Sequence, residues 1–453
     1  MKSVIICDME GVIQEMNQAA LQLFGYSKEE LVGKKRVSIF SPGEIVIQNV
    51  LGWLKKANKE GKAIVKTKFL KKDGSEFNAE IIITPNFAHG RKKGQTGYCG
   101  ITKPINDKVD IPITYLTKFI KGIAITRGGF TLASILPMIV VSCFLAATGN
   151  LNFLNSIFSI FGVACLHLFS NLYNDYYDVN YGTDEANSEY FNVGDKSFVL
   201  RGAQISGGSR AVELGLTTLD RTKKLANIML FLSIISLVVV SVNSFLVTGT
   251  LNNLTGMILV AVIATFLGYF YTAKPLRLAG RKGLGELTIF FVFGPLLTLG
   301  SALAMSATSY NFSLDSFTVF LLLGCPLGLL TTNILFINQF PDYNSDKKTG
   351  KVNLVVLLGK KASRWIYFFN VVLILSSTYL VSKSFLKTIN GFDENIFNII
   401  LGVLAAYGVY ISIGLIRFYN SRDLIKYNIQ TIYYQIFFCF ALISSLTFFI
   451  NSL

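Results

Sequence analysis

The chain has 453 residues, of which 51% are hydrophobic and 15% charged, with a mean hydropathy of +0.49 and a net charge of +15. These values are unusual for a soluble protein and typical of a chain with several membrane spans. The positive charge does not require a nucleic-acid partner, because Lys and Arg collect in the cytoplasmic loops of membrane proteins. Two histidines and six scattered cysteines argue against a zinc site, a disulfide framework and a Ser/His/Asp triad.

The first hundred residues alternate short apolar runs with turn signals and carry many charges, as a soluble domain does. We expect a small α+β domain over residues 1–108, followed by a linker over 109–126. The expected elements are a hairpin around Glu10-Gly11, short helices over 18–34, two strands joined at Asp73-Gly74, and a last strand over 95–105.

Long uncharged runs fill the rest of the chain. Residues 127–453 are therefore predicted to form an all-α polytopic bundle of about nine transmembrane helices, each near the ~20 residues that a bilayer requires. The expected spans are two within 127–175, two within 224–274, and one each over 286–306, 317–340, 364–382, 395–416 and 430–452.

The basic residues of this region predict its orientation. Lys and Arg gather in the loops after the second, fourth, sixth and eighth spans, whereas the opposite loops hold only Lys383 and Lys387. By the positive-inside rule the basic loops and the N-terminal domain lie in the cytoplasm, and the C-terminus lies outside. We therefore expect a multi-pass protein of the cell (inner) membrane.

The second span ends in polar groups, in the stretch "NLYNDYYDVNYGTD" over 171–184. Ionisable groups at a membrane helix are costly and are usually functional. Several recur at three- to four-residue spacing and so share one helix face, namely His167, Asn171, Asn174 with Asp175, and Asp178. For His167 two readings stay open, a hydrogen bond between helices and a substrate contact.

A second acid pair ends the sixth span. The stretch "NQFPDYNSDKKTGK" places Asn338, Asp342 and Asp346 at i, i+4 and i+8, and opens to the same side of the membrane as the first. Two facing carboxylate pairs repel each other unless divalent cations lie between them. Mg²⁺ takes few protein carboxylates and keeps positions for phosphate oxygens, so we expect a Mg²⁺-bound diphosphate at the mouth of an apolar bundle.

Basic and aromatic residues surround these acids. A leaving diphosphate needs its negative charge neutralised, for which the candidates are Arg210, Lys274, Arg277 and Lys351. The apolar interior suits a long isoprenoid, so an allylic diphosphate satisfies both halves of the site. Aromatic rings near the mouth either stabilise the resulting allylic cation or form an interfacial belt, and they are Tyr173, Tyr176, Tyr177, Phe270 and Tyr271.

These motifs, with "GGSRAVELGL" and "YTAKPLRLAGRKGLGE", resemble the UbiA superfamily of intramembrane prenyltransferases over roughly residues 115–453. They look most like the menaquinone branch, 1,4-dihydroxy-2-naphthoate polyprenyltransferase. The resemblance implies polyprenyl transfer from the diphosphate to the naphthoate ring, coupled to loss of its carboxylate. It also implies Mg²⁺-diphosphate binding by Asn174, Asp175, Asp178, Asp342 and Asp346, a further acid at Asp184, and Lys274 and Lys351 near the diphosphate.

The N-terminal domain resembles a PAS sensor domain, on "NQAALQLFGYSKEELVGK", "KKDGSEFNAEIIITP" and "GYCGITKPI". No reactive cysteine stands in the setting that a flavin PAS domain needs, and only His89 could ligate haem, so we expect neither. Regulation through a small ligand or through self-association of this domain is a hypothesis.

Three alternatives stay open at this point. The same fold could use another acceptor, such as 4-hydroxybenzoate, homogentisate, a chlorophyllide, a glycerol phosphate ether or haem. A PAS-gated membrane sensor could bind a prenyl diphosphate or a quinone without turnover. An ion-coupled transporter ranks last, because transporter sites lie near the middle of the membrane on broken helices.

Overall fold

The protein is described by a computed structural model that covers residues 2–9, 11–182, 209, 211–212, 215–309, 314–389, 392–421 and 423–447. Its contacts divide the chain into two units. The first joins Met1–Gly128 with Asp178–Thr222, and the second joins Gly129–Tyr177 with Lys223–Leu453.

The first unit contains a five-stranded antiparallel sheet in the order β2-β1-β5-β4-β3. Its strands are β1 Ser3–Asp8, β2 Ile13–Met16, β3 Ala63–Leu70, β4 Glu76–Asn86 and β5 Gly97–Pro104. The β3–β4 hairpin turns where the sequence predicts it, because Asp73 accepts a hydrogen bond from the Ser75 amide (2.8 Å) and Gly74 supplies a φ of 82°.

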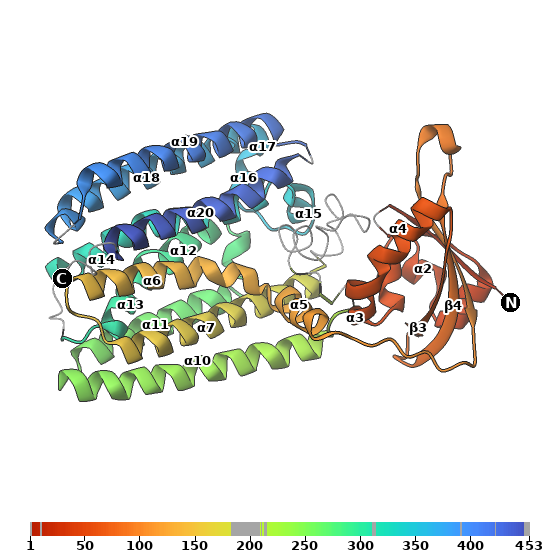
Figure 1. Ribbon diagram of the computed structural model, residues 1–453, viewed down its shortest axis with the longest axis horizontal. Coiled ribbons are helices and arrows are strands. Elements are labelled where there is room, and N and C mark those ends of the chain that lie inside the picture. The colour runs from red at the N-terminus through yellow and green to blue at the C-terminus, as the bar shows by residue number, and fades with distance from the viewer. Residues whose placement is uncertain are drawn as a thin grey trace. The chain divides into compact units, whose positions relative to one another are not determined.

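Short helices pack on this sheet (Figure 1). They are α1 Gln18–Phe24, α2 Lys28–Leu31, α3 Gly43–Ile45 and α4 Leu51–Glu60. Short 3-10 helices lie at Val37–Phe40 and Arg91–Lys93, and a π-helical turn at Val46–Val50. Aromatic rings fill the core between them. The ring of Phe24 lies 4.2 Å from that of Phe40, 5.8 Å from that of Phe69 and 5.6 Å from that of Phe77. The expected linker holds a further helix, α5 Tyr115–Thr126, and Gln48 binds it by accepting from Thr117 (2.8 Å).

The second unit is a helix bundle (Figure 1). Among the described residues nine helical segments are long and apolar enough to cross a membrane, which confirms the predicted fold class. The long helices are α6 Leu132–Ala147, α7 Phe153–Asn180, α10 Leu219–Thr248, α11 Asn252–Phe270, α12 Leu284–Phe293, α13 Pro295–Met305, α14 Leu314–Asn338, α18 Ile366–Ser384, α19 Glu394–Phe418 and α20 Leu424–Thr447. Short helices α15 Tyr343–Lys348, α16 Leu354–Leu358 and α17 Lys360–Ser363 connect α14 to α18, and 3-10 turns lie at Gly128–Thr131, Leu278–Gly280 and Leu386–Thr388.

The expected span over 286–306 consists of two helices, α12 and α13. The break falls at Pro295, which has no N–H to donate to the preceding turn. At this point α14 approaches closely, since a Cβ on Gly294 would lie 2.4 Å from the carbonyl oxygen of Gly324. Helix α14 is the most enclosed span and packs against α12, α13, α18 and α20.

Because successive spans alternate in direction, the ends of α7, α11 and α14 and the beginnings of α12, α18 and α20 fall on one side of the bundle. The polar motifs of the sequence lie in these ends and in the loops that join them.

Candidate active site

The first acid motif, which comprises Asn174, Asp175 and Asp178, occupies the end of α7. Asp175 is 3% exposed and Asp178 is 5% exposed, one helical turn apart on one face. The helix ends at Asn180, where Gly182 takes a φ of 71° and donates its N–H to the Val179 carbonyl (3.1 Å). Asn171, one turn before Asn174, is half-buried. The sequence therefore locates these groups correctly on one helix.

The second acid motif, which comprises Asp342 and Asp346, does not lie on one continuous helix with Asn338. Helix α14 ends at Asn338, and α15 begins at Tyr343. The reason is Pro341, which lacks an N–H and disfavours a helical conformation for the residue before it. The i, i+4, i+8 spacing is therefore interrupted by a turn.

Asp346 is buried, with an exposure of 3%. One carboxylate oxygen accepts from the Asn353 side-chain amide at 2.7 Å. The other lies 3.7 Å from the Lys351 ammonium, and the Lys351 backbone N–H donates to the Asp346 carbonyl at 2.8 Å. Asn353 is itself fixed, because its Oδ1 caps α16 by accepting from the Val356 N–H at 2.8 Å. The predicted lysine of "KKTGK" is thus beside the predicted acid.

Asn338 forms a contact that the sequence did not predict. Its side-chain oxygen accepts from the Asn428 amide at 2.7 Å, which ties the end of α14 to α20. One turn and a half earlier, Asn333 accepts from Asn370 at 2.8 Å and ties α14 to α18. These bonds hold the helix that leads into the second acid motif.

The loop between α11 and α12, residues 271–283, is here called the basic loop because it carries Lys274, Arg277, Arg281 and Lys282. Its Thr272 hydroxyl donates to Asn174 Oδ1 at 3.0 Å, which connects it to the first acid motif. Its Lys282 N–H donates to the Val352 carbonyl at 2.6 Å, and the Val352 N–H donates to the Gly280 carbonyl at 3.2 Å. One loop is therefore bonded to both acid-bearing segments.

Within the basic loop the two predicted cations differ in setting. Lys274 is exposed, whereas Arg277 is half-buried and donates to the Thr349 carbonyl at 3.4 Å. Arg277 has a φ of 42°, a backbone conformation uncommon for a residue with a side chain. Tyr271, at the end of α11, is half-buried and accepts from the Ala279 N–H at 2.8 Å through its carbonyl.

Glu286, in the first turn of α12, is a residue of this region that the sequence analysis missed. It is 4% exposed, and its Oε1 accepts from the Gln339 amide and from the Leu354 N–H, both at 2.8 Å. Gln339 follows α14, and Leu354 follows the Asn353 that binds Asp346. The available signal was an acid at the start of the apolar run "LTIFFVF", where a charge is costly.

The tyrosines near the mouth form one packed cluster. The hydroxyls of Tyr177 and Tyr269 lie 2.9 Å apart, and the Tyr173 hydroxyl donates to Asn227 of α10 at 2.9 Å. The Lys223 ammonium lies 5.8 Å from the Tyr176 ring centre. The rings thus join α7, α10 and α11 beside the first acid motif.

His167 lies deeper along α7 and is 9% exposed. Its Nδ1 is 2.7 Å from the Ser134 hydroxyl of α6, and its ring centre is 5.0 Å from that of Phe293. Of the two readings of this residue, the structure shows the hydrogen bond between helices.

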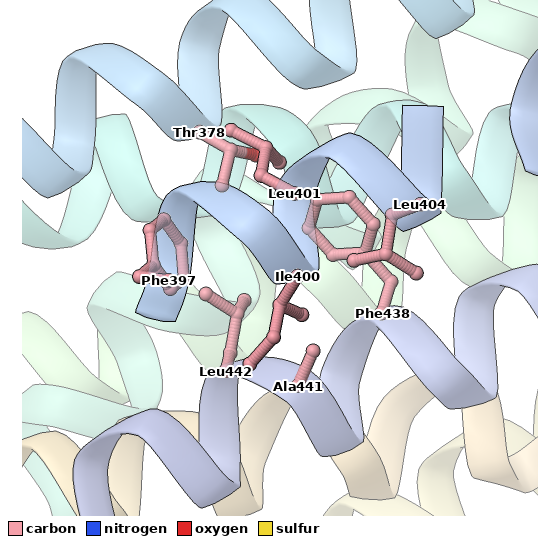
Figure 2. Close-up of a pocket in the computed structure, with 8 residues that line it drawn as sticks. All are labelled: Thr378, Phe397, Ile400, Leu401, Leu404, Phe438, Ala441 and Leu442. Atoms are coloured by element: carbon pink, nitrogen blue, oxygen red, sulfur yellow. The ribbon is translucent and has the colours of Figure 1, made fainter. Parts of the chain in front are cut away.

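A narrow apolar recess lies between α18, α19 and α20 (Figure 2). It is lined by Thr378, Phe397, Ile400, Leu401, Leu404, Phe438, Ala441 and Leu442. None of these side chains is titratable, and none belongs to the acid motifs.

Two predicted site residues, Asp184 and Arg210, lie outside the described residues. Across the described part of the chain, no group of three or more His, Cys, Asp and Glu side chains is close enough to hold a metal ion. The donor set nevertheless fits Mg²⁺, since carboxylate and amide oxygens are the ligands that hard divalent cations take.

In the described part of the chain, nine spans with carboxylates, amides and lysines gathered at one end of the bundle are the architecture of a polytopic membrane protein. The profile of the UbiA prenyltransferase family matches residues 135–439, well over half of the chain, and a PAS domain profile matches residues 1–101. The chain belongs to the UbiA prenyltransferase family, as its motifs predicted, and carries a PAS domain before the bundle.

Named relatives match parts of the chain. A 1,4-dihydroxy-2-naphthoate octaprenyltransferase of Escherichia coli is 28% identical over 219 residues, which are 48% of this chain and 61% of that protein. A 2-carboxy-1,4-naphthoquinone phytyltransferase of Synechocystis is 35% identical over 120 residues, 26% of this chain and 35% of that protein. The matched segments thus span less than two thirds of either relative. A solved structure of a UbiA homolog from Archaeoglobus fulgidus bound to DMAPP and Mg²⁺ aligns with 72% of this chain and 99% of that chain, at 16% identity and a TM-score of 0.44.

Proposed function

We propose that this chain is a Mg²⁺-dependent prenyltransferase that moves a polyprenyl group from an allylic diphosphate to 1,4-dihydroxy-2-naphthoate. The observation that carries the proposal is the pair of contacts made by the basic loop. Thr272 binds the first acid motif, and the loop backbone binds Val352, in the segment that follows the second acid motif. The names of the relatives above support the naphthoate as the acceptor.

Each predicted residue has a role in this proposal. Carboxylates would hold the cations, and these are Asp175, Asp178, Asp342, Asp346 and Asp184. Cationic and polar side chains would bind the diphosphate or orient its ligands, and these are Lys274, Lys351, Arg210, Asn171, Asn174 and Asn338, with Tyr271 contacting the first isoprene unit. Bound Mg²⁺ would neutralise the diphosphate and so improve it as a leaving group.

The chain's own residues prepare this reaction. Lys351 lies 3.7 Å from Asp346, where its ammonium can pair with a diphosphate oxygen as negative charge develops. The bond between C1 of the prenyl group and the diphosphate oxygen breaks, and the electron pair leaves with the diphosphate. The naphthoate ring carbon that bears the carboxylate supplies the electron pair for the new bond to C1. The bond between this carbon and the carboxylate then breaks, its electron pair restores the aromatic ring, and CO₂ leaves without gain or loss of a proton.

The placement of the domains belongs to the same proposal. The PAS domain would cover residues 1–108, the connection 109–126 and the prenyltransferase domain 127–453. The excess of Lys and Arg in the loops beside the acid motifs supports a cytoplasmic site mouth and PAS domain, with the C-terminus outside.

The experiment uses membranes containing the full chain, a labelled polyprenyl diphosphate, Mg²⁺ and one aromatic acid at a time, with products identified by mass spectrometry. Asp175→Asn is the test variant, and Asp423→Asn, at an exposed loop carboxylate, is the control. We expect a prenylated, decarboxylated naphthoate as the product. It should disappear when EDTA is added and in Asp175→Asn, but persist in Asp423→Asn. Product from a different acceptor would overturn the naphthoate assignment, and tight diphosphate binding with no product would favour a sensor.

A further inference from the structure

A turn of the loop between α7 and α10 packs onto the PAS domain. Ala211 and Leu216 are each 3% exposed, and the Leu216 N–H donates to the Ala211 carbonyl at 2.8 Å. A Cβ on Gly43, the first residue of α3, would lie 2.7 Å from Leu216 Cα and 2.8 Å from the Gly215 carbonyl oxygen. The turn and α3 therefore meet backbone to backbone, and only a glycine at position 43 permits this contact.

The next residue of α3 connects the same surface to two further helices. Glu44 accepts from the Lys121 ammonium of α5 at 2.5 Å, and Arg221, in the first turn of α10, acts on the same carboxylate through its charge. Burial alone would raise the pKa of Glu44, but the hydrogen bond from Lys121 and the charges of Lys121 and Arg221 hold it below its ordinary value. Leu216, which contacts Gly43 of α3, lies three residues before Leu219, so α3 contacts the segment that leads directly into α10.

The following turns of α10 reach the first acid motif. The Lys223 ammonium lies over the Tyr176 ring at 5.8 Å, and Asn227 accepts from the Tyr173 hydroxyl at 2.9 Å. Tyr173 and Tyr176 stand on either side of Asn174 and Asp175 in α7. Because α10 is one continuous helix from Leu219, a change at its first turn moves the turns that hold these tyrosines.

We infer that the PAS domain controls the prenyl-transfer site through α10, with its α3 surface holding the helix start in the position that supports the first acid motif. The inference rests on the proposed function and adds the regulation of that site.

The test compares two glycines of the PAS domain in the full-length protein. Gly43→Ala places a methyl group against Leu216, whereas Gly52→Ala adds the same methyl where nothing lies within 4 Å. Two quantities are measured, the amide hydrogen exchange of residues 211–222 and kcat/KM for the prenyl diphosphate. In Gly43→Ala we expect faster exchange in this segment and a fall in kcat/KM of about five-fold or more, with Gly52→Ala matching the wild type.

The outcomes separate the steps of the inference. Unchanged exchange in Gly43→Ala would overturn the contact, and faster exchange with unchanged or increased kcat/KM would overturn the coupling. A double-mutant cycle of Glu44→Gln and Arg221→Gln gives a second test, since losses that simply add would contradict a shared path. Hydrogen exchange needs no turnover, so a wild type without prenyl transfer would count against the proposed function rather than against the contact.

Discussion

Replacing Glu286 with alanine removes one acceptor oxygen on which two segments of the site depend. Oε1 of this buried side chain accepts from Gln339, at the end of α14, and from the Leu354 N–H at the start of α16. The buried Gln339 amide and the partly buried Leu354 N–H would then both lose this acceptor. Since Leu354 follows the Asn353 that binds Asp346, the damage is expected to reach the second acid motif as well as the fold.

The size of the effect follows from the two lost bonds. An unsatisfied buried donor costs about 1–3 kcal/mol, so the two together destabilise the native state by roughly 2–6 kcal/mol. This is a large share of the ~5–15 kcal/mol by which a native domain is stable. Glu286→Gln keeps a carbonyl oxygen in the acceptor position and is expected to lose less than about 1.5 kcal/mol.

The assay is thermal unfolding of the purified protein in detergent, together with KM for the prenyl diphosphate in whatever fraction folds. Asp423→Ala, which removes an exposed carboxylate, is the control for loss of charge. We expect the unfolding temperature to fall strongly in Glu286→Ala, slightly in Glu286→Gln and hardly in the control. If Glu286→Gln were as unstable as Glu286→Ala, the charge of Glu286 and not its acceptor geometry would be what matters.

Three further predictions concern the second acid motif and the PAS domain. Asn353→Ala removes the cap of α16, worth about 1 kcal/mol, and the amide that binds the buried Asp346, worth about 1–3 kcal/mol, so unfolding should become easier by roughly 2–4 kcal/mol. Half-maximal activity should also need more Mg²⁺, and an unchanged Mg²⁺ titration would refute this second part. Lys351→Met should raise KM for the prenyl diphosphate with little change in unfolding temperature, and a normal KM would remove Lys351 from the diphosphate site. The pKa of Glu44 is lowered in the folded state, so its pairing with Lys121 stabilises the protein at a pH above the unfolded-state pKa near 4.5, and this stabilisation is lost as the pH falls below it. The stability difference between wild type and Glu44→Gln should therefore shrink on acidification. A difference that stays constant with pH would contradict the pairing.

The spans and the PAS sheet were predictable because their signals are local. Each span is an apolar run of sufficient length, and the β3–β4 turn is specified by Asp73-Gly74 alone. The end of α14 before the second acid motif was also encoded locally, by Pro341, and the expected span over 317–340 ends within two residues of it.

Contacts between distant segments could not be predicted in this way. The bond that the Asn338 side chain accepts from Asn428 of another span is one such contact. The bonds of Glu286 and the contact of Gly43 with Leu216 depend on which surfaces meet in three dimensions, and no periodicity of one segment specifies them.

The central claim is that the two acid motifs bind one Mg²⁺-diphosphate together. Its most direct test is the affinity for a labelled, non-reactive allylic thiodiphosphate over a Mg²⁺ titration, in wild type, Asp175→Asn, Asp346→Asn and the double variant. We predict that each single change weakens binding ten-fold or more and that the double variant loses little beyond either one, because the motifs act as a unit. Normal binding in Asp346→Asn, or losses that add independently, would contradict a shared site.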